Sequence, residues 1–139
     1  MRVMLDTNVL ISILIFDSKK LKLLLNKITN DYYLVLSSYV IDELKEVVKR
    51  KFNNKLYDLE IFLYNLPFEI YYTPNSILNT DNKAIRDVKD FPVLYSSVMS
   101  DVDVLVTGDK DFSDIKLEKP EILTPSDFLI NIVKTIYSG

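Results

Sequence analysis

The sequence predicts an α/β protein with a central parallel sheet, because strand-like and helix-like segments alternate along its length. Short apolar, β-rich runs recur at intervals and are separated by segments with helical spacing. The chain has 139 residues and no repeats or linkers, so one domain over residues 1–139 is expected. The four predicted strands are residues 2–6, 32–38, 68–72 and 102–108.

The segments after the first two strands carry helical signals. The apolar run at residues 9–16 is longer than a typical strand and predicts a buried helix. A second helix is expected to begin at Ser18, because serine is a favoured N-cap residue and apolar residues then recur on one face. Ser37 or Ser38 is expected to cap a third helix, which runs to about Phe52.

Proline residues help to place the remaining helices. The pattern at residues 55–66 predicts a helix that ends before Pro67, since the residue preceding a proline disfavours helix. Pro92 falls in the first turn of another predicted helix, where proline is tolerated. Thr124 is the expected cap of the last helix, with Asp127 three residues after it.

The composition excludes several kinds of active site. The chain contains no cysteine and no histidine, so a serine–histidine triad, a cysteine nucleophile and a nitrogen–sulfur zinc site are ruled out. Any metal must be held by oxygen atoms, which points to hard ions such as Mg²⁺ or Mn²⁺. The net charge of −3 neither favours nor excludes contact with nucleic acid. The apolar run 9–16 is too short to cross a bilayer and lacks a signal-peptide cleavage site, so a cytoplasmic location is expected.

Acidic residues follow two predicted strands, at the edge where parallel sheets bind ligands. Asp6 ends the first strand, whereas Asp109 and Asp111 follow the fourth. Gly108, the sole interior glycine, is expected to let the chain turn so that Asp109 faces this edge. Adjacent carboxylates raise each other's pKa, and a bound cation removes that cost. The alternative is that Asp6 and Asp109 only cap the helix or turn that follows them.

Further acids are candidates on helices. Glu43 lies at the border of the apolar face of its helix without a salt-bridge partner at i+4, whereas Glu46 has Arg50 there. A plain boundary glutamate is the alternative for Glu43. Asp90 and Asp87 precede the helix that contains Pro92, and either suits a helix N-terminus. The lysine clusters are interpreted as solvated surface and the tyrosines as core or interface.

Five segments, in order and spread over nearly the whole chain, resemble the PIN (PilT N-terminus) domain. They are MLDTNVL (4–10), SSYVIDEL (37–44), DVKDFPVL (87–94), LVTGDKDF (105–112) and ILTPSDFL (122–129). The chain is most similar to short prokaryotic PIN proteins of the VapC-like toxin group. The resemblance implies a three-layer α/β/α sandwich and a metal-dependent ribonuclease that uses Mg²⁺ or Mn²⁺. It also implies a small antitoxin partner and a homodimer.

The resemblance also implies roles for individual residues. The family's four acids correspond to Asp6, Glu43, Asp90 and Asp109, which are the expected catalytic and metal-binding residues. The family motif selects Asp90 over Asp87 for the third of them. Positions that commonly support these four acids correspond to Asn8, Thr107 and Asp111. The chain departs from the family at Tyr95, Ser96 and Ser97, where relatives have alanines, and at Asp101, where they have a small residue.

Other functions remain open at this level. A structure-specific DNA nuclease is the alternative among enzymes, because the PIN fold resembles that of flap endonucleases. A receiver-like signalling module would need a phosphoacceptor aspartate after its third strand, but residues 68–72 are followed by Thr73 and Pro74. A non-catalytic module that binds a protein is the third alternative, and it gives no reason for four acids.

Overall fold

The protein is built around a five-stranded sheet in which every strand pairs in parallel, in the order β3-β2-β1-β4-β5. The computed structural model describes residues 1–79, 90–112 and 115–138. This sheet confirms the predicted α/β class and the four predicted strands. The strands are β1 (Arg2–Leu5), β2 (Tyr33–Ser37), β3 (Glu69–Tyr71), β4 (Val104–Val106) and β5 (Glu121–Leu123).

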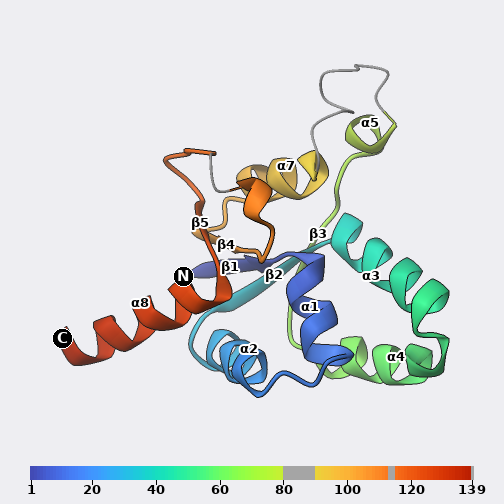
Figure 1. Cartoon of the computed structure of the whole chain (residues 1–139). Helices are drawn as coiled ribbons and strands as arrows, with labels where there is room; N and C mark the ends of the chain where they lie inside the picture. The colour runs from blue at the N-terminus through green and yellow to red at the C-terminus, as the bar shows by residue number, and fades with distance from the viewer. Residues whose placement is uncertain (80–89, 113–114, 139) are drawn as a thin grey trace.

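Helices cover both faces of the sheet (Figure 1). α7 lies over one face, α1 and α2 lie under the other, and α3 contacts both α1 and α7. This arrangement is the expected three-layer sandwich. Within the described ranges, no helix has both the length and the apolar character needed to cross a bilayer. The helices are α1 (Thr7–Leu14), α2 (Lys19–Asp31), α3 (Ser38–Lys51), α4 (Leu56–Asn65), α5 (Asn75–Leu78), α7 (Phe91–Met99) and α8 (Pro125–Ser138), with short 3-10 turns η1 (Asn53–Lys55) and η2 (Lys110–Phe112).

The predicted helix starts are confirmed by capping hydrogen bonds. The hydroxyl groups of Ser18, Ser37 and Thr124 each accept a hydrogen bond from the backbone N–H three residues ahead, at 3.3, 3.1 and 3.1 Å. Each bond satisfies an amide that has no partner within its own helix. Ser37, rather than Ser38, is therefore the cap of α3.

The sequence does not predict β5, because its three residues are followed at once by the helix start at Thr124, whereas the equally short edge strand β3 lies within the β-rich run 68–72. The register between β1 and β4 has a consequence for the site. β4 lies between β1 and β5, and Leu5 of β1 is in register with Val106 of β4. The next residues, Asp6 and Thr107, therefore leave the sheet side by side at its carboxyl edge.

Aspartates, not glycines, occupy the described left-handed backbone positions. Asp17, Asp90 and Asp101 have φ angles of 51°, 59° and 58°, and no glycine in the described chain has a positive φ. Aspartate tolerates this region better than most residues, because its short polar side chain can hydrogen-bond locally. The departure at Asp101 is thus accommodated, and its carboxylate also lies 3.1 Å from Lys119 Nζ.

The serines that replace alanines on α7 are buried and hydrogen-bonded. Ser96 and Ser97 are both fully buried. The Ser96 hydroxyl lies 2.8 Å from the hydroxyl of Thr73, which follows β3, and the Ser97 hydroxyl donates to the carbonyl of Leu94 at 2.7 Å. The polar replacements therefore fit the packing of α7, because each hydroxyl finds a partner.

Replacing Ser96 with alanine should destabilise the fold by about 1–2 kcal/mol, because the buried Thr73 hydroxyl would lose its partner. The double variant Thr73→Val/Ser96→Ala removes both hydroxyl groups and should recover part of this loss. Urea unfolding of the wild type, both single variants and the double variant measures the effect. If the loss of stability in the double variant equalled the sum of the losses in the two single variants, the two side chains would not be coupled.

Candidate functional site

Asp6 lies at the centre of the candidate site, at the point where β1 ends and α1 begins. Its side chain is only 3% exposed. One carboxylate oxygen accepts the backbone N–H of Thr7 at 2.7 Å, and the other accepts the hydroxyl of Thr107 at 2.8 Å. Asp6 is thus the N-cap residue of α1, as the alternative interpretation expected, and it is also fixed against β4.

The residues after β4 form a chain of hydrogen bonds that positions Asp109. The Thr107 hydroxyl accepts the backbone N–H of Asp109 at 3.0 Å while it donates to Asp6. The Asp109 carboxylate accepts the backbone N–H of Asp111 at 2.9 Å. Asn8 holds the same turn, because its side-chain oxygen accepts the N–H of Gly108 at 3.0 Å. The three expected supporting residues, Asn8, Thr107 and Asp111, therefore surround Asp109 and Asp6.

The expected conformational role of Gly108 is wrong. Gly108 does not adopt a positive φ. A Cβ atom there would meet Asn8 Oδ1 at 3.5 Å, which is ordinary van der Waals contact. The turn toward Asp109 thus depends on the hydrogen bond between Asn8 and the Gly108 amide, and not on backbone freedom that only glycine provides.

Glu43 is half-buried on α3, as its position at the border of the apolar face predicts, whereas Asp42 and Glu46 are exposed. Glu46 pairs with Arg50 at 3.5 Å as expected. The absence of a salt-bridge partner at i+4 does not leave Glu43 without a local partner, since its carboxylate accepts the hydroxyl of Tyr39 at 3.2 Å. Tyr39 lies one helical turn earlier, at i−4, on the same face of α3.

Asp90 stands at the N-terminus of α7 but makes no capping hydrogen bond with its side chain. Its carboxyl group instead interacts with Asp109 through a side-chain hydrogen bond, which requires that one of the two carries a proton. Burial, this bond and the charges of Asp6, Asp109 and Glu43 raise the pKa of Asp90 to about 7. Asp87, the other candidate for this role, lies outside the described residues.

Electrostatic interactions join the four acids into one group. Burial raises the pKa of Asp6, the hydrogen bonds from Thr107 and Thr7 oppose this increase, and the charges of Glu43 and Asp109 add to it. Burial and the nearby Glu43 carboxylate raise the pKa of Tyr39, so that its hydroxyl stays a hydrogen-bond donor. The structure therefore brings together all four predicted acids and one tyrosine that the sequence analysis did not assign to the site.

The geometry of the acids is not that of a closed metal site. Across residues 1–79, 90–112 and 115–138, no three acidic side chains are arranged to hold one metal ion. The hydroxyl of Thr7, next to Asp6, is buried and has no hydrogen-bond partner within these same ranges. The donor chemistry is that of Mg²⁺ or Mn²⁺, because the clustered groups are carboxyl and hydroxyl oxygens.

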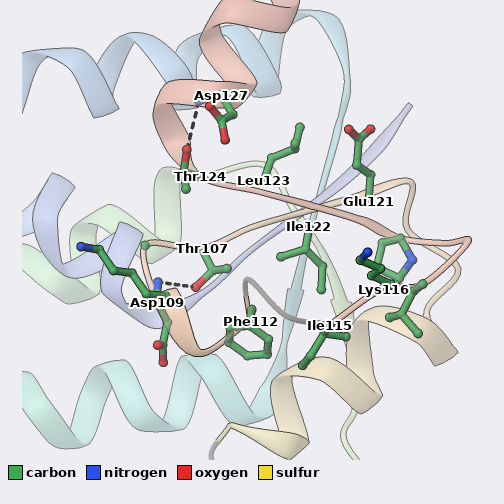
Figure 2. A pocket seen from close by; sticks show the side chains of 14 residues that line it. Thr107, Asp109, Phe112, Ile115, Lys116, Glu121, Ile122, Leu123, Thr124 and Asp127 are labelled. Atoms are coloured by element: carbon green, nitrogen blue, oxygen red, sulfur yellow. Dashed lines mark hydrogen bonds between the residues drawn. The ribbon is translucent and has the colours of Figure 1, made fainter.

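A cleft opens beside the acids, between the segment after β4 and the start of α8 (Figure 2). Its volume is about 440 Å³. Thr107, Gly108 and Asp109 form the wall that it shares with the acidic group. The lysines of α2 and α3 that the sequence analysis assigned to solvated surface do not line this cleft.

Replacing Asp90 with asparagine should change how stability depends on pH in the metal-free protein. The pKa of Asp90 is raised on folding, so its ionisation destabilises the folded state as the pH increases from about 4 to 7. The shift corresponds to about 4 kcal/mol, and partial exposure reduces the expected effect to about 1–2 kcal/mol. Asparagine removes the charge and tolerates the left-handed backbone of this position.

The measurement is urea unfolding in EDTA at several pH values. The stability of the wild type relative to Asp90→Asn should fall between pH 4 and 7 and stay constant above pH 8. Asp42→Asn, at an exposed carboxylate one residue before Glu43, controls for the loss of one negative charge. If the difference in unfolding free energy between the wild type and Asp90→Asn did not change with pH, Asp90 would not be held near the other acids.

Comparisons with known proteins agree with the fold described above. The solved structure of VapBC2 from Rickettsia felis, bound to a DNA fragment from its promoter, contains a similar chain, with a TM-score of 0.66, 19% identity and coverage of 88% of this chain and 97% of that one. A toxin–antitoxin complex from Klebsiella pneumoniae gives a TM-score of 0.61 and 20% identity over the same shares. No curated protein matches the sequence significantly. The sequence model of the PIN domain matches residues 2–111, which include all four acids, and the chain therefore belongs to the PIN domain family.

Proposed function

We propose that this protein is a metal-dependent endoribonuclease and the toxin of a toxin–antitoxin pair. The observation that carries the proposal is the group of four mutually repelling acids at the carboxyl edge of the sheet, one of which has a pKa near neutrality. Repulsion between carboxylates lowers the stability of the fold, and a bound cation removes it, so such a group favours cation binding. Membership in the PIN family supports the nuclease activity.

Asp6, Glu43, Asp90 and Asp109 would hold Mg²⁺ or Mn²⁺. The bound ion supplies positive charge, without which a pocket of carboxylates repels the phosphate of a substrate. Since no three of the described acidic side chains share the arrangement of a metal site, we expect ion binding to draw the carboxyl groups together. The proton on the Asp90–Asp109 pair would be released at the same time, because both groups must then be ionised.

The neighbouring residues keep the acids in place. Thr107 fixes Asp6 by donating its hydroxyl hydrogen, and it fixes the chain at Asp109 by accepting an amide. Tyr39 directs one carboxylate oxygen of Glu43. These contacts hold the acidic side chains in place before an ion binds, which would increase their affinity for the ion.

A protein partner is part of the proposal. Both solved relatives are described as complexes of toxin with antitoxin, and we extend that partnership to this chain. Its surface offers a groove between α1, α2 and α4 that combines apolar residues such as Leu14, Ile61 and Phe62 with the charged residues Asp17, Lys22 and Asp58. Such grooves on soluble proteins commonly accept partner segments. We also propose a homodimer, which light scattering of the purified protein would test.

Replacing Asp109 with asparagine should reduce cleavage of single-stranded RNA at least 100-fold, because the metal site loses one of its charges. The asparagine oxygen can still accept the Asp111 amide, so the fold should be retained. The assay uses a labelled RNA with Mg²⁺, Mn²⁺ or EDTA, and Asp42→Asn is the control for charge removal.

The same assay separates the alternatives. Metal-dependent cleavage of RNA that is lost only in Asp109→Asn is the expected result. Preferential cleavage of branched or flapped DNA would favour the DNA nuclease instead. Full activity of Asp109→Asn would contradict the assignment of the acidic group as the active site.

Replacing Tyr39 with phenylalanine should lower the rate of cleavage about 10-fold, since residues that orient a metal ligand commonly contribute 10- to 100-fold to metal affinity or activity. Excess metal should restore part of this loss, because the variant weakens binding of the ion more than the chemical step. Titration of Mn²⁺ against the cleavage rate measures this. Tyr57→Phe, at an exposed tyrosine of α4, is the matched control and should be unchanged.

A further inference from the structure

The cleft beside Asp109 has the size and shape of a small-ligand site. Its volume of about 440 Å³ falls in the range of about 300–1,000 Å³ that is typical for small-molecule sites. Figure 2 shows side chains from η2, β5 and the start of α8 around the opening.

The lining combines an apolar wall with polar groups of both charges. Phe112, which is 3% exposed, lies with Ile115 and Ile122 along one side. Lys110 and Lys116 are exposed and make no ion pair or hydrogen bond within the described parts of the chain. Glu121 and Asp127 lie on the other side of β5 from the apolar wall, and Glu121 also lines a separate hollow with Leu123 and Phe128. A purely anionic ligand does not suit this combination, and neither does a purely apolar one.

We propose that this cleft binds an unpaired nucleobase of the RNA strand whose phosphate is held at the acidic group. A nucleobase has apolar faces, which match the apolar wall formed by Phe112, Ile115 and Ile122. The phosphates that flank the base are anionic, and the two free lysines are placed to contact them. The inference rests on the proposed nuclease function, and it adds the part of the substrate that the protein recognises.

The position of the cleft supports a base that lies close to the cleaved bond. Thr107 and Asp109 belong both to the hydrogen-bonded network around Asp6 and to the wall of the cleft. A strand that crosses the acidic edge with one phosphate therefore has its neighbouring base next to the cleft. A duplex cannot present a base in this way without unpairing, so the cleft favours single-stranded RNA.

The test is a titration of ¹⁵N-labelled protein with each of the four nucleoside 5′-monophosphates in the presence of Mg²⁺, since a monophosphate contains no phosphodiester bond that the protein could cleave. We expect amide shifts at Lys110, Phe112, Ile115 and Lys116, with an affinity that differs between bases. Lys116→Glu should weaken this binding about 3- to 10-fold. Leu117→Ala, at a rim residue that is 42% exposed, should also weaken it without affecting the fold.

Two controls separate the base from the phosphate and the cleft from general charge. Ribose 5-phosphate lacks the base, and it should produce smaller shifts or none in the cleft. Lys45→Glu reverses an exposed lysine on α3 that does not line the cleft, and it should bind nucleotides like the wild type.

Several outcomes would overturn the inference. Equal shifts with ribose 5-phosphate would show a phosphate site without base recognition. No shifts in the cleft, from a protein that cleaves RNA, would leave the nuclease standing and refute the base site. Shifts in the cleft by nucleotides, from a protein that does not cleave RNA with any metal, would keep nucleotide binding and refute the nuclease.

Discussion

The buried carboxylate of Asp6 is the constraint around which the site is organised. A carboxylate that is 3% exposed would be strongly unfavourable without partners, and both of its oxygens accept hydrogen bonds. One bond comes from the start of α1 and the other from the end of β4. The two central strands and the first helix are therefore joined at one point. Thr107 extends this junction to Asp109, because its hydroxyl donates to one acid and accepts the amide of the other.

Around this fixed centre, the fold concentrates negative charge instead of dispersing it. Asp90 is held near Asp6 and Asp109 although its backbone must adopt a left-handed conformation, and its side chain does not cap α7. Backbone strain and carboxylate repulsion at one place are typical of functional sites, where the rest of the structure supplies the stability. The hydrogen-bonded serines of α7, Ser96 and Ser97, contribute to that stability, since they fix the helix that follows Asp90.

The sequence predicts this architecture well where local chemistry determines it. The caps at Ser18, Ser37 and Thr124, and the meeting of strand ends at Asp6 and Asp109, follow from rules that act over a few residues. The errors concern contacts that such rules do not contain. The edge strand β5 lacks the β-rich flanking residues that mark the equally short β3. The bond from Tyr39 to Glu43 joins an uncharged hydroxyl to a carboxylate at i−4, which a rule for salt bridges at i+4 does not include. The conformation at Gly108 depends on Asn8, which is 100 residues away in sequence.

In the proposed function, the acidic group would bind the phosphate of the substrate and the cleft would bind a base. Carboxylates that hold a cation can retain any phosphate, so they provide attachment and chemistry but no preference for one nucleotide over another. Preference requires contact with a base, and the cleft beside Asp109 is lined for that contact. Thr107 and Asp109 belong both to the network around the acids and to the wall of the cleft. A base bound in the cleft would therefore determine which phosphate lies over the acids. Under the proposed function, the spacing between these two parts of one edge would select the bond that is cleaved.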